Sequence, residues 1–233
     1  MRQSFLSMPT RDRTERVAAV CSALHSLYGD PRLGNPEDPV DDLVYIVLSN
    51  KTREMTATTA YRALKAEYPS WERLAGASHD QLARLLHPCG LAGVRAEQLI
   101  GTMEQLIRDF GSCHLDALRS STDSEVLAYL RTLPGVSEKV AKCVMMYTLD
   151  RGVLPVDTHV HRIASRLGWT NKRRLDQCGR ELEELVPSAR RYAFHVDCIV
   201  HGRLVCRARS PHCAHCCLYD YCEFGWRKNA SRG

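Results

Sequence analysis

The stretch LPGVSEKVAKC, residues 133–143, contains the turn that decides the fold of this chain. Proline and glycine in so short a break form a tight turn, which ends one helix and lets the next, EKVAKCVMMYTL, begin. Such a turn presents backbone N–H groups at a helix N-terminus, where a phosphate group binds well. The motif alone leaves two interpretations open, a nucleic-acid-binding hairpin or a hairpin that serves packing only.

Apolar residues recur at helical spacing on both sides of this turn, and no alternating strand pattern persists. Two pairs, Ser78 with Gln81 and Thr122 with Glu125, have the spacing of a capping box, in which the two residues close the first turn of a helix. The sequence therefore predicts an all-α fold.

Length and composition narrow the class of protein. The chain has 233 residues, 44% apolar and 25% charged, as in a globular protein that buries a sizeable core. The N-terminal segment MRQSFLSMPTRDR lacks the apolar run of a signal peptide. The longest apolar run, LVYIVL at residues 43–48, is far shorter than the roughly 20 residues that span a bilayer. We expect a cytoplasmic protein.

Positive charge is concentrated near the C-terminus. Residues 201–233 hold six basic residues against two acidic ones, which accounts for +4 of the net charge of +5. A basic patch favours an anionic partner, nucleic acid above all, although a solvated tail has the same composition. The six are Arg203, Arg207, Arg209, Arg227, Lys228 and Arg232.

Five of the eleven cysteines lie within CRARSPHCAHCCLYDYC, residues 206–222. Cys206, Cys213, Cys216 and Cys222 have the spacing C-x6-C-x2-C-x5-C, which Cys217 does not fit. Disulfides are rare in the cytoplasm, so a tight cysteine cluster indicates metal binding or redox chemistry. Four thiolates suit zinc or an iron–sulfur cluster, and the spacing leaves both open.

A third motif, PVDTHVHRIASRLGW, occupies residues 155–169 and contains Asp157, eighteen residues after Lys139. Asp157 or Thr158 can cap the helix that follows. The alternative is that Asp157 is paired with Lys139 across a cleft.

Taken in order, LPGVSEKVAKC, PVDTHVHR and the four-cysteine spacing resemble the endonuclease III family of DNA glycosylases over roughly residues 13–225. The resemblance implies a helix-hairpin-helix fold with two helical lobes and a DNA-binding cleft between them. One lobe would be a six-helix barrel, residues 35–150. The other would join residues 1–34 to 151–233 around a [4Fe-4S] cluster held by the four spaced cysteines.

The resemblance also assigns catalytic roles, with Lys139 as the nucleophile and Asp157 as the catalytic aspartate. A carboxylate stabilises the positive charge that forms on the sugar as a base leaves. A neutral amine attacks C1′, forms a Schiff base and permits β-elimination of the strand. Free lysine has a pKa of about 10.4, so the site must lower the pKa of Lys139 for activity near neutrality.

The implied function is base excision repair by a bifunctional DNA glycosylase/AP lyase that flips out and excises damaged bases, oxidised pyrimidines foremost. Its partner would be double-stranded DNA containing damaged bases or abasic sites. We expect a monomer that acts at the nucleoid of a bacterium. Gly135 and Ser137 of the turn, with Arg207 and Arg209 of the loop between the first two spaced cysteines, would contact DNA.

Two further positions bear on base recognition. Leu91, in CGLAGVRAEQL, matches the family's wedge residue, which fills the stack after a base flips out; its alternative is ordinary core. Lys51, in LSNKTRE, stands where the family commonly has a glutamine facing the orphaned base. Because lysine replaces that glutamine, the resemblance does not predict which base this protein prefers opposite the lesion. His159 and His161 are expected to orient neighbours or contact phosphate rather than bind metal.

Three alternatives remain. Adenine glycosylases of this fold carry a catalytic glutamate where this chain has Ile46, which argues against that activity. Plant enzymes that excise methylated cytosine resemble residues 142–169, which keeps modified cytosine open as a substrate. A non-catalytic DNA-binding or redox module would need neither Lys139 nor Asp157.

Overall fold

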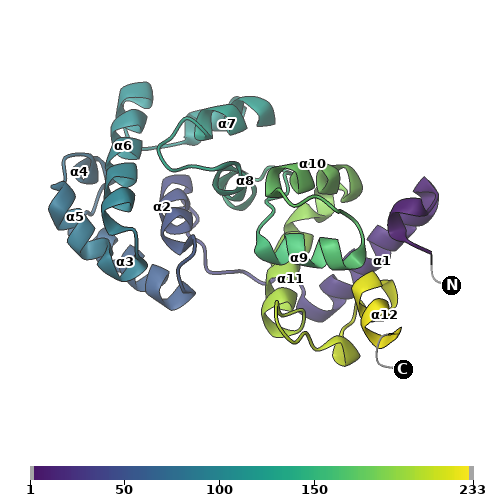
Figure 1. Ribbon diagram of the computed structural model, residues 1–233. Coiled ribbons are helices and arrows are strands. Elements are labelled where there is room, and N and C mark those ends of the chain that lie inside the picture. The colour runs from purple at the N-terminus through teal and green to yellow at the C-terminus, as the bar shows by residue number, and fades with distance from the viewer. Residues whose placement is uncertain (1–2, 231–233) are drawn as a thin grey trace. The chain divides into compact units, whose positions relative to one another are not determined.

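The computed structural model describes residues 3–230, and every regular element in that range is helical (Figure 1). The prediction of an all-α fold is confirmed. The chain divides into two compact units, one made of Gly34–Arg151 and the other of the residues before and after it. We call them the hairpin unit and the cysteine unit. None of the described helices is long and apolar enough to cross a membrane.

The hairpin unit is built around α2 (Pro39–Ser49), a helix buried along almost its whole length. It packs against α3 and α8, as Figure 1 also shows. A helix that is apolar on all faces belongs in the centre of a bundle, because no side of it favours water. The remaining helices are α3 (Glu54–Glu67), α4 (Trp71–Ala75), α5 (His79–Leu86), α6 (Ala92–Phe110), α7 (Asp123–Leu130) and α8 (Glu138–Tyr147).

The two predicted capping boxes have different outcomes. At the start of α7, Thr122 Oγ1 accepts the N–H of Glu125, and the Glu125 carboxylate accepts the N–H of Thr122 at 2.8 Å. The prediction of a capping box at Ser78 is wrong, because the Ser78 side chain makes no capping hydrogen bond to α5. Ser78 is exposed, so water can satisfy the free N–H groups there without help from the hydroxyl.

The cysteine unit joins the N-terminal helix to the C-terminal third of the chain. Its core is centred on Trp169, whose ring lies 5.6 Å from the rings of both Phe5 and Phe194, centroid to centroid. Residues from the first and last parts of the chain therefore share one apolar interior. Its helices are α1 (Thr10–Tyr28), α9 (Thr158–Leu167), α10 (Leu175–Leu185), α11 (Ser188–Leu204) and α12 (Glu223–Ala230).

Candidate functional site

The turn between α7 and α8 has the geometry of a closely packed hairpin. Gly135 has φ +76°, a conformation that favours glycine, and a Cβ there would lie 2.4 Å from the side chain of Gln98, which would have to move. Ser137 caps α8 by accepting the N–H of Val140 at 3.4 Å. Gly135 and Ser137 are both exposed. The turn thus ends in an exposed, capped helix N-terminus.

Lys139 is the second residue of α8 and is half-buried. It lies close enough to Asp42 of α2 for its charge to act on that carboxyl. Asp42 is fully buried, and its Oδ1 accepts a hydrogen bond of 2.6 Å from Asn35, whereas Oδ2 has no partner. Burial raises the pKa of Asp42 to about 7, against the smaller lowering effects of Asn35 and Lys139. Sequence reasoning missed this carboxyl because it stands beside Asp41 at the start of a helix, where acidic residues are common and usually exposed.

Asp157 is the N-cap of α9. Its Oδ1 accepts the backbone N–H groups of His159 at 2.9 Å and of Val160 at 2.8 Å. The predicted capping role is confirmed. A carboxylate at this position also benefits from the positive end of the helix dipole. The side chain remains partly exposed, so capping does not remove it from solvent.

The segment before Asp157 is held by side chains that sequence reasoning missed. His195, which is buried, binds the carbonyl of Pro155 through Nδ1 at 2.9 Å. Glu183 accepts the N–H of Leu154 at 2.8 Å. These contacts come from α10 and α11, about 30 to 40 residues away, and no local spacing signals them. They fix the backbone that presents Asp157.

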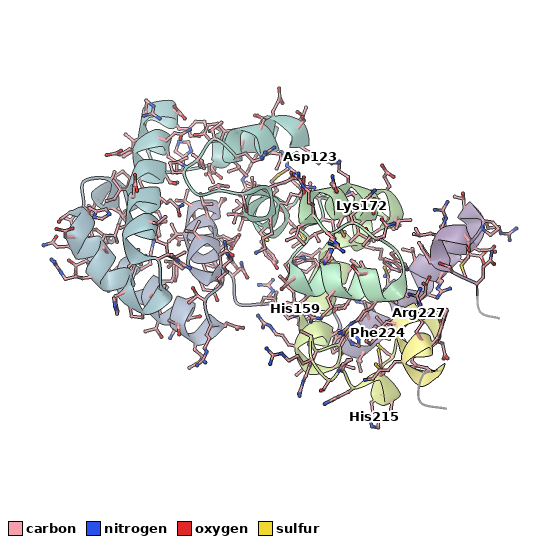
Figure 2. All side chains as sticks on the ribbon, viewed as in Figure 1. Asp123, His159, Lys172, His215, Phe224 and Arg227 are labelled. Carbon is pink, nitrogen blue, oxygen red and sulfur yellow. The ribbon has the colours of Figure 1, made fainter. Side chains whose placement is uncertain are left out.

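His159 and His161 both contact protein groups, as the orienting role predicted. His159 Nδ1 lies 3.1 Å from Nη2 of Arg162, and burial lowers the pKa of His159. Arg162 also donates to the carbonyl of Gly202 at 2.8 Å, and a Cβ at Gly202 would lie 2.5 Å from His159. His161 Nε2 lies 2.8 Å from the carbonyl oxygen of Lys172 (His159 and Lys172 are labelled in Figure 2).

The four spaced cysteines lie in the segment between α11 and α12. Cys222 is buried and the other three are half-buried. Nη1 of Arg166 donates to Sγ of Cys206 at 3.1 Å, and the N–H of Gly225 donates to Sγ of Cys222 at 3.4 Å. Among the described residues, no three of these thiols have sulfurs within 4.8 Å of one another. Donors to sulfur are typical of iron–sulfur sites, where they tune the potential.

Cys216 and Cys217 both pack against the core of the cysteine unit, and Cys216 also contacts a buried histidine. Sγ of Cys216 lies 3.4 Å from Nε2 of the buried His201, whose Nδ1 contacts the Tyr28 hydroxyl at 2.9 Å. Burial lowers the pKa of His201 to about 4, so the ring is neutral near pH 7. Burial raises the pKa of Cys216 to about 12, so a bound metal would have to displace its proton. Cys217 packs against the core of the unit.

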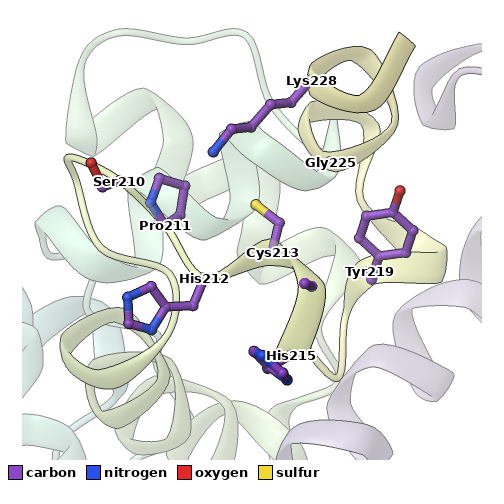
Figure 3. Close-up of a pocket in the computed structure, with 9 residues that line it drawn as sticks. Ser210, Pro211, His212, Cys213, His215, Tyr219, Gly225 and Lys228 are labelled. Carbon is purple, nitrogen blue, oxygen red and sulfur yellow. The ribbon is translucent and has the colours of Figure 1, made fainter. Parts of the chain in front are cut away.

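A pocket of about 620 Å³ opens beside Cys213. Figure 3 shows the Cys213 thiol and the Lys228 side chain of α12 pointing toward one another across it. Arg207 and Arg209, in the loop leading to this pocket, are both exposed, as a contact with phosphate requires. Arg232, the last of the predicted basic residues, lies outside the described residues.

Leu91 and Lys51 share an unusual backbone conformation in the hairpin unit. Leu91 precedes α6 with φ +51°, and Lys51 follows α2 with φ +58°. Leu91 is 70% exposed, which makes the core interpretation wrong. Lys51 is also exposed. Non-glycine residues rarely adopt positive φ, and such strain is concentrated at functional sites.

Comparison with known proteins agrees with these features. Residues 44–188 match the model of the HhH-GPD superfamily of base excision DNA repair proteins. Endonuclease III of Thermotoga maritima is 31% identical over 198 residues, covering 85% of this chain and 89% of the relative. Endonuclease III of Synechocystis sp. is 31% identical over 226 residues, covering 94% and 97%.

Among solved structures, a non-covalent endonuclease III–DNA complex contains a chain with the same fold. The TM-score is 0.84 with 22% identity, over 96% of this chain and all of that chain. The function supported by these matches is base excision repair by a DNA glycosylase with AP lyase activity. The chain belongs to the HhH-GPD superfamily and, within it, to the endonuclease III family.

Proposed function

We propose that Lys139 is the nucleophile and Asp157 the electrostatic catalyst of a bifunctional glycosylase acting on damaged pyrimidines in duplex DNA. The observation that carries the proposal is the placement of Lys139, half-buried in the first turn of α8 directly after the glycine-dependent turn.

In this reaction the Lys139 amine forms a bond to C1′ while the bond from C1′ to the base breaks, and the base leaves with that electron pair and takes up a proton. The sugar ring then opens to a Schiff base on Nζ. Loss of a C2′ proton breaks the C3′–O bond, which cleaves the strand by β-elimination. Asp157, fixed by two N–H donors, stabilises the positive charge on the sugar as the base leaves.

The proposed cofactor is a [4Fe-4S] cluster on Cys206, Cys213, Cys216 and Cys222. The sulfurs of Cys206 and Cys222 accept hydrogen bonds from Arg166 and from the N–H of Gly225, and donors to sulfur of this kind support an iron–sulfur site. When bound, the group would hold the loop bearing Arg207 and Arg209 in place, and we assign it no step in the reaction.

For DNA contact, we propose that Gly135 and Ser137 bind phosphate at the turn, with Leu91 as the wedge and Lys51 facing the orphaned base. The enzyme would act as a monomer at the nucleoid of a bacterium. Since Lys51 departs from the family's usual glutamine, the opposite-base preference needs direct measurement.

Borohydride trapping on duplexes that each carry one lesion tests the proposal. Wild-type protein should form a covalent complex with abasic DNA and with at least one oxidised pyrimidine, and Lys139→Gln should form none, because the variant lacks the amine. The substrate series should include methylated cytosine and mismatched bases. If Lys139→Gln is trapped at the wild-type level, another residue is the nucleophile. If the wild type binds DNA but is not trapped, the non-catalytic alternative is supported.

A further inference from the structure

Lys51 and Leu91 lie in two separate turns of the hairpin unit, and both hold strained positive-φ conformations while exposed. A side chain that enters DNA must keep its conformation in the absence of a partner. Strained residues persist only where their surroundings hold them in place. The contacts around these two turns therefore bear on how the wedge works.

Arg95, four residues after Leu91 in α6, reaches the turn that contains Lys51. Its Nη1 donates to the carbonyls of Val47 at 2.9 Å and Leu48 at 2.6 Å. Its Nη2 donates to the carbonyl of Asn50 at 2.7 Å and to the hydroxyl of Thr52 at 3.0 Å. The groups on both sides of Lys51 are thus bound by one guanidinium.

The same network returns to Leu91. The Thr52 hydroxyl, which accepts from Arg95, donates to the carbonyl of Cys89 at 3.1 Å, two residues before Leu91. The backbone N–H of Arg95 donates to the carbonyl of Leu91 at 2.9 Å. These hydrogen bonds form a closed ring, which runs from Leu91 to Arg95, then to Thr52 and Cys89. The backbone from Cys89 to Leu91 completes it.

The chemistry of this site suits arginine in particular. Arg95 is only 6% exposed, and its positive charge lies on carbonyls at the C-terminal end of α2, where the helix dipole is negative. The last carbonyls of a helix have no partner within the helix. A planar fork with five donors can bind several of them at once, whereas lysine presents all its donors from one nitrogen.

We propose that Arg95 is a positioning residue that fixes the Lys51 and Leu91 turns relative to each other, so that both enter DNA together during base extrusion. This proposal rests on the proposed glycosylase function. It predicts that loss of Arg95 impairs the removal of a base that must first be unstacked, more than it impairs the removal of one that is already unpaired.

The experiment compares Arg95→Met and Arg95→Lys with a matched control, Arg151→Met. Arg151 lies in the same unit and also binds several loop carbonyls, those of Leu118 at 3.2 Å, Arg119 at 2.8 Å and Ser121 at 2.9 Å, far along the chain from Lys51 and Leu91. Single-turnover excision is measured for one lesion, well paired and opposite a mismatch, at a temperature where all variants are folded.

Arg95→Met should lose on the order of tenfold on the paired lesion and much less on the mismatched one, since a paired base must first be unstacked and unpaired. Arg95→Lys should show an intermediate rate loss on the paired lesion. It replaces Arg95→Met in the test if the methionine variant does not fold. Arg151→Met should leave the ratio of the two rates unchanged. Combined with Leu91→Ala, Arg95→Met should cost less than the product of the two single losses, because both changes act through one wedge.

Hydrogen exchange gives a readout that does not depend on activity. In Arg95→Met the amides of residues 50–52 and 89–92 should exchange faster, and in Arg151→Met those of residues 118–123. An inactive wild type would overturn the proposed function, and this inference with it. If wild type is active, two results would overturn the inference and leave the proposed function standing. One is that Arg95→Met loses equally on both lesions. The other is that the rate loss of the double variant equals the product of the losses of Arg95→Met and Leu91→Ala.

Discussion

The guanidinium of Arg166 lies 3.1 Å from the sulfur of Cys206 and also donates to the carbonyls of Arg207 and Ala208. Arg166 is in the last turn of α9, the helix that Asp157 caps at its other end. One ten-residue helix therefore connects the capping carboxylate to the first cysteine of the metal-binding segment. The loop bearing the exposed arginines is held by this helix as well as by any cluster.

Arg166→Met should weaken DNA binding without lowering the iron content, because it frees the loop and leaves all four cysteines in place. If Arg207 and Arg209 each neutralise one phosphate, the slope of log K against log salt concentration should fall by about 2. Fluorescence anisotropy at several salt concentrations measures this. Arg174→Met, at an exposed arginine of the same unit, is the control and should leave the slope as it is. If Arg166→Met leaves the slope unchanged, the prediction that this loop contacts DNA phosphates is wrong.

Cys213→Ala should lose the cluster, whereas Cys217→Ala should keep normal iron. The first removes one of four thiolate ligands, and the second removes a side chain that packs against the core. Iron and sulfide assays, with the yellow-brown absorbance, should give about four of each per chain in wild type. Stoichiometric zinc without sulfide, in protein from iron-replete cells, would contradict the cluster assignment.

Asp157→Asn should slow base release by on the order of 10²-fold or more while the protein stays folded. Asparagine is as good an N-cap as aspartate, so its side-chain oxygen can still accept the N–H groups of His159 and Val160. The charge that stabilises the sugar cation is lost. Single-turnover excision and DNA affinity are measured together. Equal falls in affinity and rate would indicate a binding role instead.

Leu91→Ala should reduce excision of a well-paired lesion much more than excision of the same lesion opposite a mismatch, since a wedge slows the return of an unstacked base. The melting temperature should barely change, because the side chain is 70% exposed. Truncating a core leucine would instead cost about 2–5 kcal/mol of stability. A large fall in melting temperature, with equal losses on both lesions, would contradict the wedge.

Asp42→Asn should flatten the pH dependence of stability. Burial raises the pKa of Asp42 from 3.8 to about 7, so between these values the folded state holds a proton that the unfolded state releases. Stability from this group is present at low pH and is lost as the pH rises from about 4 to about 7. Between pH 5 and pH 8 the loss should be at most ~3 kcal/mol.

Urea unfolding of wild type and Asp42→Asn at pH 5 and pH 8 measures this loss. Burial also raises the pKa of Asp197, to about 6, but this carboxyl is present in both proteins, so its contribution cancels in the comparison. An identical pH dependence in the two proteins would show that Asp42 does not titrate in this range.

The features that could be predicted from the sequence depend on residues close together in the chain. The turn at Gly135, the capping box of Thr122 with Glu125 and the cap at Asp157 each involve groups within a few residues, whose spacing determines the local hydrogen bonds. The close spacing of the four cysteines likewise indicates that they bind a common metal centre. At Ser78 the same spacing did not produce a capping hydrogen bond, so the local prediction was wrong there.

Long-range contacts decided the rest. Arg95 meets Val47 across 48 residues, and Arg166 meets Cys206 across 40. Asp41 and Asp42 are adjacent in the sequence, and only the packing around α2 buries the carboxyl of Asp42 and raises its pKa. Leu91 was predicted to be a wedge by its resemblance to the family's wedge residue, and only the fold, which leaves the side chain 70% exposed, excluded the alternative of ordinary core. Burial and partner choice depend on which distant segments the fold brings together, and no local spacing contains that information.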